Sequence, residues 1–129
     1  MNVLIVESEL GLASALKASI ESWSYRAEVS GGARQGMRKL RDGKFDVVLL
    51  DLGLPDSPGE DLISRMKKEQ PGIGVIAMTT NSSREMELNA RMQGILFYMI
   101  KPPQIENLKN ILDHLSRGNV NVAIYGKES

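Results

Sequence analysis

The chain has no cysteine among its 129 residues, and it has one histidine and one tryptophan. The absence of cysteine excludes disulfide scaffolds, iron–sulfur clusters and thiolate zinc sites. An excess of charge of one sign is also absent, because 16 lysine and arginine residues balance 16 aspartate and glutamate residues. A neutral chain is not generally attracted to phosphate backbones or anionic lipid, so we expect no direct contact with nucleic acid or membrane.

Long apolar runs are missing as well. No segment approaches the ~20 apolar residues that cross a bilayer, and Met1-Asn2-Val3 leads directly into an apolar stretch without a cleavable leader. We therefore expect a cytoplasmic protein. Its 42% hydrophobic and 25% charged residues suit one folded domain that is long enough to bury its own core.

Two hydrophobic periodicities alternate along the chain. Short apolar runs rich in β-branched residues predict buried strands, and apolar residues at steps of three and four between them predict helices. The expected strands span 3–6, 25–29, 46–51, 73–78 and 96–100, and the helices 10–23, 33–42, 62–70, 83–93 and 105–117. This order predicts a (βα)5 α/β fold: a doubly wound five-stranded parallel sheet in a flavodoxin-like, three-layer αβα sandwich.

Polar residues follow the ends of four expected strands. Ligands of parallel α/β sheets bind beyond the carboxyl ends of the strands, so these residues are the candidates for chemistry. They are Glu7 and Ser8 after the first strand, Asp51 at the end of the third, Thr79 after the fourth and Lys101 after the fifth. A carboxylate near an acid, a hydroxyl and an ammonium can accept a phosphoryl group. The carboxylate attacks, and a divalent cation, the hydroxyl and the ammonium bind the phosphoryl charge.

Four segments carry a resemblance to a known family, in matching order and spacing: VLIVES, DVVLLDLGLPDSPG, VIAMTT and YMIKPP. Pro55 and Gly59 stand four and eight residues after Asp51, and Lys101-Pro102 follows the last strand. Together they resemble the receiver domain of two-component response regulators, which would occupy residues 1–117. The resemblance implies a signalling domain, not an enzyme. It implies phosphorylation by a histidine kinase or phosphotransfer protein, and a conformational change relayed to an output domain or partner protein.

The resemblance also assigns roles to individual residues. It makes Asp51 the phosphoacceptor, Thr79 the switch hydroxyl, Tyr98 the aromatic switch and Lys101 the phosphate-binding ammonium.

The implied cofactor is Mg²⁺, held by Glu7, Asp51 and the backbone carbonyl of Gly53. Receivers usually end their first strand in two consecutive acids, but Ser8 stands at the second position here. Mg²⁺ prefers charged oxygen ligands, so Ser8 is the weakest candidate ligand, and we expect reduced metal affinity and slower phosphorylation. The alternative is a pseudo-receiver, an interaction module of the same fold with weak or no phosphorylation.

Two other classes of protein place similar groups at a sheet edge. A haloacid-dehalogenase-type phosphatase also uses a strand-end aspartate as nucleophile, but it needs a second acid two residues later, where Gly53 stands. A flavodoxin-like flavin binder needs a phosphate loop rich in serine, threonine and glycine after its first strand. Glu7-Ser8-Glu9 would repel that phosphate.

Two regions bear on assembly. Many receivers place acids before the tyrosine of the fifth strand for dimer salt bridges, which Leu96-Phe97 cannot form. A homodimer held together by hydrophobic contact remains an alternative, and Leu88, Met92 and Ile100 would contribute apolar surface to it. Residues 118–129 form a tail that we interpret as a linker, with an added strand or a pairing segment for a second chain as alternatives.

Overall fold

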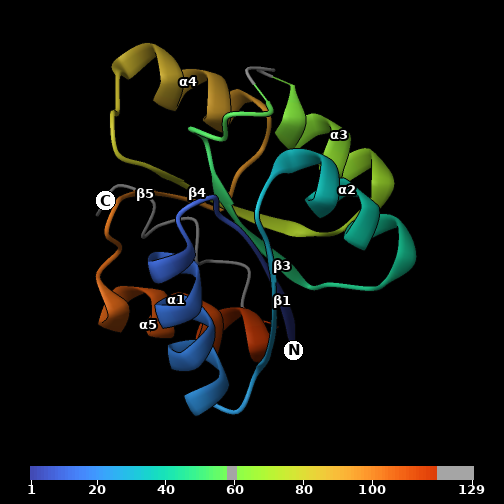
Figure 1. Cartoon of the computed structure of the whole chain (residues 1–129), viewed down its shortest axis with the longest axis vertical. Helices are drawn as coiled ribbons and strands as arrows, with labels where there is room; N and C mark the ends of the chain where they lie inside the picture. The colour runs from blue at the N-terminus through green and yellow to red at the C-terminus, as the bar shows by residue number, and fades with distance from the viewer. Residues whose placement is uncertain (58–60, 119–129) are drawn as a thin grey trace.

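The computed structural model of the chain describes residues 1–57 and 61–118, in which strands and helices alternate (Figure 1). The strands are β1 (Asn2–Val6), β2 (Arg26–Ser30), β3 (Val47–Asp51), β4 (Gly74–Thr79) and β5 (Phe97–Ile100). The helices are α1 (Leu10–Ser22), α2 (Ala33–Asp42), α3 (Leu62–Glu69), α4 (Arg84–Met92) and α5 (Ile105–Ser116). Every expected element is therefore present in the expected order.

All five strands run parallel in one sheet, in the order β2-β1-β3-β4-β5. Asp51 pairs with Met78, and Thr79 pairs with Ile100, so the carboxyl ends of the strands lie along one edge. Because β1 and β3 are neighbours, Glu7 follows β1 beside the end of β3. The predicted doubly wound parallel sheet is confirmed.

The side chains of each central strand alternate between two hydrophobic clusters. In β1, Val3 and Ile5 belong to one cluster, whereas Leu4 and Val6 belong to the other, and all four are fully buried. Helices α1 and α5 cover the first face of the sheet, and α2, α3 and α4 cover the second, as Figure 1 shows. Burial on both faces explains the unbroken apolar runs of the sequence and confirms the three-layer sandwich.

Two strands are shifted by one residue from their predicted bounds. β2 begins at Arg26 because Tyr25 belongs to the turn after α1, where its N–H donates to the carbonyl of Ile20. β4 spans 74–79 rather than 73–78, since Thr79 still pairs with Ile100 of β5. The bounds of the other strands differ from the prediction by one residue at most.

Within the residues that the structure describes, no helix is long and apolar enough to cross a bilayer. Helix α5 ends at Ser116, next to the predicted domain boundary at residue 117. Residues 119–129 of the tail and Gly59 of the loop motif lie outside the described residues, so what we expect of them stays a prediction.

Candidate functional site

The side chain of Lys101 links the ends of β1, β3 and β5. Its Nζ lies 2.8 Å from Glu7 Oε1 and 3.3 Å from Asp51 Oδ2. A backbone N–H holds the second oxygen of each carboxylate. Glu9 donates to Glu7 Oε2 at 2.9 Å, and Gly53 donates to Asp51 Oδ1 at 2.9 Å. The fold thus brings three of the sequence-predicted site residues into direct contact.

Water is largely excluded from this group of ions. Glu7 is fully buried, Asp51 is 4% exposed, and the side chain of Lys101 is 12% exposed. Burial by itself lowers the pKa of Lys101, but its contact with Glu7 and the negative charge of Asp51 outweigh burial and raise that pKa above the usual value. Lys101 is therefore an ammonium at neutral pH. With two carboxylates around it, the group carries a net negative charge.

Two carboxylates, rather than three, are available to a divalent cation. Among the described residues, no three Asp, Glu, His or Cys side chains are grouped to hold a metal ion. Glu7 Oε1 is buried and faces the ammonium of Lys101. Ser8 is exposed. The remaining groups fit Mg²⁺, which proteins often hold through one or two carboxylates while it keeps several waters.

Thr79 is the last residue of β4 and is 2% exposed. Its carbonyl accepts a hydrogen bond from the N–H of Lys101 at 2.8 Å. This bond fixes the loop after β4 relative to the loop after β5. Thr79 therefore lies at the same sheet edge as Lys101, with its backbone tied to that residue.

The ring of Tyr98 points into the protein and is 1% exposed. Its hydroxyl lies 2.7 Å from Ser82 Oγ in the loop after β4. Arg91 of α4 places its guanidinium carbon 5.9 Å from the ring centroid, within the range of a cation–π interaction, while its Nη2 pairs with Glu87 at 2.8 Å. Tyr98 thus connects β5 to α4 and to the loop that begins after Thr79.

A cavity of about 460 Å³ lies beside Asp51, between the loop after β3 and helices α3 and α4. Its lining includes both apolar and polar side chains. The lining residues that matter for the site are Asp51, Gly53, Leu54, Ser83, Met86 and Asn89. The phosphoacceptor predicted from the sequence therefore borders a space that opens between two helices, although Asp51 itself is nearly buried.

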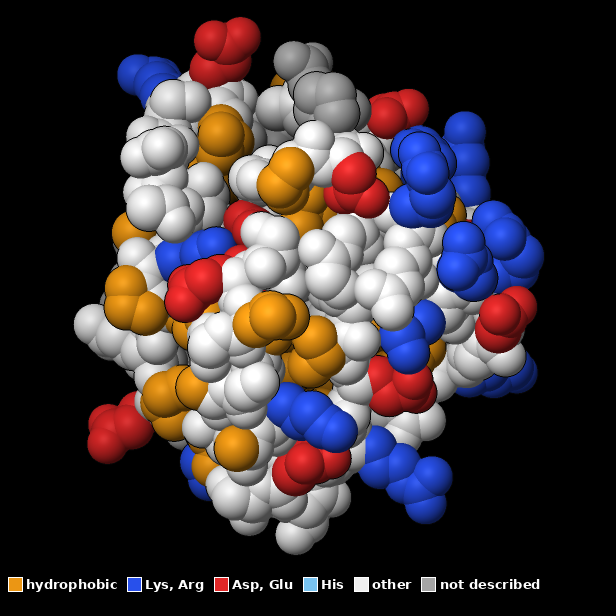
Figure 2. All heavy atoms as spheres, viewed as in Figure 1, with side chains coloured by type: hydrophobic (Ala, Val, Ile, Leu, Met, Phe, Trp, Pro, Cys, Tyr) orange, Lys and Arg blue, Asp and Glu red, His pale blue; other side chains and the backbone are white. Residues whose placement is uncertain are grey.

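The balance of charge over the whole chain conceals an uneven surface. Lysine and arginine outnumber acidic residues within both α2 and α3, and Figure 2 shows these basic side chains gathered on the side of the molecule where Figure 1 places the two helices. Lys39 and Arg41 of α2 are paired with Glu28 and Glu69, whereas Arg34 and Arg38 line a hollow next to Ser8. A neutral net charge is therefore compatible with a basic face close to the site.

The protein-family model described as the response regulator receiver domain matches residues 3–113 of this chain. The chain belongs to this family. The receiver domain is 30% identical over 113 residues to the transcriptional regulatory protein ZraR of Escherichia coli strain K12, a match that covers 88% of this chain and 26% of ZraR. It thus spans about a quarter of that relative's length.

Solved structures agree with this assignment. The receiver domain superposes with a TM-score of 0.86 on a CheY-like response regulator receiver domain protein from Methanospirillum hungatei JF-1, at 25% identity, covering 92% of this chain and 94% of that one. It also matches the beryllofluoride-activated NtrC4 receiver domain dimer, with a TM-score of 0.84 and 26% identity, over 92% of this chain and 98% of the other. The predicted receiver fold is therefore confirmed.

The chain is a receiver domain of the two-component response regulators, homologous to receivers that can be phosphorylated. The predicted family is confirmed, and the phosphatase and flavin-binder alternatives are set aside. The pseudo-receiver interpretation is not favoured over phosphorylation. Receiver domains are in general signalling modules, and they typically bind Mg²⁺.

Sequence reasoning missed three residues that support the site. Ser82 stands in the polar run TTNSS, and nothing in its spacing indicated the contact with Tyr98. Nothing in the sequence around Arg91 indicated its contact with the ring of Tyr98. Asp56 lies inside the loop motif, but its contacts are with α2, as described below.

Proposed function

We propose that this receiver domain accepts a phosphoryl group on Asp51 from a phosphohistidine of a histidine kinase or phosphotransfer protein in the cytoplasm. A carboxylate oxygen of Asp51 attacks phosphorus, the bond between phosphorus and the donor nitrogen breaks, and the imidazole leaves with its electron pair. The observation that carries the proposal is the orientation of Asp51. Gly53 fixes Oδ1 through its N–H, and Lys101 faces Oδ2 at 3.3 Å.

Lys101 binds the transferred phosphoryl group through its ammonium. In the unphosphorylated domain this ammonium is shared between Glu7 and Asp51, and its raised pKa keeps it charged. Phosphorylation replaces the single negative charge of Asp51 with a more negative group, so the balance of attraction shifts from Glu7 towards residue 51. The hydroxyl of Thr79, at the end of the adjacent strand, supplies a hydrogen bond to a phosphoryl oxygen.

Glu7, Asp51 and the backbone carbonyl of Gly53 are the groups that would hold Mg²⁺, with Ser8 as the weakest candidate. The ion, when bound, neutralises charge on the phosphoryl oxygens as they approach the carboxylate. Because the site has two carboxylates where the usual receiver has three, we expect weaker Mg²⁺ binding and a slower transfer than in receivers with two acids after β1.

The phosphorylated state is relayed through the loop after β4. Ser82 stands three residues after Thr79 and shares a hydrogen bond with the hydroxyl of Tyr98. A movement of Thr79 towards the phosphoryl group therefore displaces the partner of Tyr98, and the ring and α4 adjust together. This is a shift between two packed arrangements rather than a continuous deformation.

The surface that changes is apolar and exposed. Met92 is 86% exposed, Leu88 is 52% exposed, and Ile100 and Ile105 are each 41% exposed. We propose that a second copy of the receiver domain or its output domain packs on this face, since a receiver that is 26% identical forms a dimer. Sedimentation velocity before and after phosphorylation distinguishes the two, because self-association depends on concentration.

The proposed phosphorylation is tested with the small donor phosphoramidate. In the presence of Mg²⁺, the wild-type chain gains the mass of one phosphoryl group, and Asp51→Asn does not. Asp113→Asn, which changes a carboxylate on α5 outside the site, serves as the matched control that keeps the nucleophile and is expected to be labelled. An unlabelled wild type, or labelling that survives in Asp51→Asn, would show that the proposal is wrong.

A further inference from the structure

Two hydrogen-bonded residues, Gly53 and Asp56, stand in the described part of the loop after β3, residues 52–57. Near its beginning, the N–H of Gly53 donates to Asp51. Near its other end, the carboxylate of Asp56 accepts hydrogen bonds from the backbone N–H groups of Ala33 at 2.8 Å and Arg34 at 3.1 Å. Both N–H groups belong to the first turn of α2, which begins at Ala33, 23 residues before Asp56 in the sequence.

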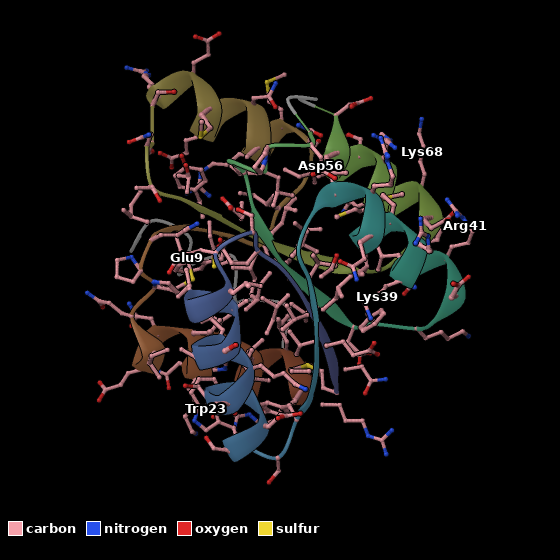
Figure 3. All side chains as sticks on the ribbon, in the orientation of Figure 1. Glu9, Trp23, Lys39, Arg41, Asp56 and Lys68 are labelled. Carbon is pink, nitrogen blue, oxygen red and sulfur yellow. The ribbon has the colours of Figure 1, made fainter. Side chains whose placement is uncertain are left out.

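Asp56 replaces a cap that α2 lacks. The residue before this helix is Gly32, which has no side chain to accept the free N–H groups of the first turn. The carboxylate of Asp56 satisfies two of them and lies at the positive end of the helix dipole. These two hydrogen bonds hold the pKa of Asp56 below its usual value. Figure 3 shows Asp56 at this end of α2.

Gly32 provides the space for that carboxylate. A Cβ at position 32 would lie 2.8 Å from Asp56 Oδ2, which is closer than real Cβ contacts. The backbone at Gly32 is extended, with φ −165° and ψ 175°, so any residue could adopt its conformation. Glycine here leaves room for the Asp56 carboxylate in its present position and is not required by the backbone conformation, so Gly32 and Asp56 form a matched pair.

Leu54 and Pro55 lie between the two hydrogen-bonded loop residues, Gly53 and Asp56. Leu54 is buried and is 4% exposed, whereas Gly53 and Pro55 are exposed. Apolar burial holds Leu54 in place without a preferred direction, because the hydrophobic effect is non-directional. The two hydrogen bonds of Asp56 are directional, and they fix how the loop is oriented over Asp51.

We infer that Asp56 is a positioning residue of the phosphorylation site: by attaching the loop after β3 to the N-terminus of α2, it holds the Gly53 backbone in the geometry that binds Mg²⁺. The inference rests on the proposed function, in which Gly53 and Asp51 face the ion. Asp56 itself touches neither the ion nor the phosphoryl group. Its loss frees the loop, so the cost is in metal affinity rather than in the nucleophile.

The test compares Asp56→Ala, Asp56→Asn, Gly32→Ala and the double variant Gly32→Ala/Asp56→Ala. Asp46→Ala is the matched control, because the Asp46 carboxylate accepts a backbone N–H from Asn2 at 2.7 Å but stands before β3, at the opposite end of that strand from Asp51. Mg²⁺ affinity is measured by calorimetry, and melting temperature is measured on the same samples. Calorimetry is preferred since Trp23 lies at the end of α1 away from the site (Figure 3).

We expect Asp56→Ala to weaken Mg²⁺ binding about three- to tenfold, at or below the lower end of the effect of outer-shell residues on metal sites, because Asp56 acts through the backbone of Gly53. Gly32→Ala should do the same, because it displaces the carboxylate, and adding it to Asp56→Ala should cost nothing more. Asp56→Asn, which keeps one acceptor oxygen, should lie between these variants and the wild type. Asp46→Ala should lower the melting temperature and leave Mg²⁺ affinity unchanged.

Unchanged Mg²⁺ affinity in Asp56→Ala, an equal loss in Asp46→Ala, or a Gly32→Ala effect that adds in full to Asp56→Ala would each overturn the inference. Should Asp56→Ala not fold, Asp56→Asn and Gly32→Ala decide by the same titration. Phosphoramidate labelling separates this outcome from the proposed function. A labelled wild type with unchanged affinity in Asp56→Ala overturns the inference alone, whereas an unlabelled wild type overturns the proposed function.

Discussion

Lys101 and Lys109 each place an ammonium 2.8 Å from a carboxylate, yet the surroundings of the two pairs differ. The partner of Lys101 is the fully buried Glu7, whereas Lys109 and its partner Asp113 have side chains that are 47% and 23% exposed. An exposed pair stabilises a protein by about 0–1 kcal/mol, but a buried charge that loses its partner costs several times more. At equal distance, burial decides which lysine the domain depends on.

Lys101→Met gives the largest effect expected from this comparison. It leaves Glu7 and Asp51 without their counter-charge, so we expect the free energy of unfolding at neutral pH to fall by about 3–5 kcal/mol. Urea denaturation at neutral pH measures this loss, with Lys109→Met as control. An equal loss in the two variants would contradict the comparison.

The contribution of the Lys109–Asp113 pair to the stability of the domain should depend on pH. The hydrogen bond from Lys109, followed by that from Tyr25, holds the pKa of Asp113 below its usual value. A lowered pKa means that the contribution is present above the ordinary aspartate range and is lost as pH falls through the folded-state pKa. We therefore expect Asp113→Asn to destabilise the domain at neutral pH and to approach the wild type in acid. Thermal unfolding across that range measures it, and a difference independent of pH would refute it.

The smallest effect is expected at Lys17→Ala. Lys17 pairs with Glu21 along α1 at 3.5 Å, and the two side chains are 42% and 49% exposed. Such helix pairs contribute at most about 0.5 kcal/mol and are screened by salt. Chemical denaturation at low and high ionic strength should show little difference between this variant and the wild type. A loss above about 1 kcal/mol would mean that the exposed fraction of the side chains does not determine how much each ion pair contributes to stability.

The fold, and the gathering of the candidate site residues at one edge of the sheet, followed from local patterns in the sequence. Apolar runs and helical spacing place Asp51, Thr79 and Lys101 at strand ends, and a parallel sheet necessarily brings those ends to one edge. Strand bounds differed from the prediction by a residue, as at Tyr25, because hydrophobic periodicity does not reveal the hydrogen bonds made at helix ends.

The contacts within the site did not follow in the same way. That Lys101 lies closer to Glu7 than to Asp51 depends on side-chain rotamers and on burial, which spacing along the chain does not encode. Asp56 caps a helix that begins 23 residues before it in the sequence, and the hydroxyl of Tyr98 contacts Ser82 in the loop after β4. Each of these contacts exists only after the chain has folded.

The single indole of the chain has a practical consequence. Trp23 terminates α1 and packs at the margin of the cluster formed with α5, away from the edge where ions and phosphate would collect. Its emission should therefore follow cooperative unfolding and stay silent to chemistry at residue 51. In one sample, the fluorescence of Trp23 can report whether the domain is folded while an independent signal reports the reaction at residue 51.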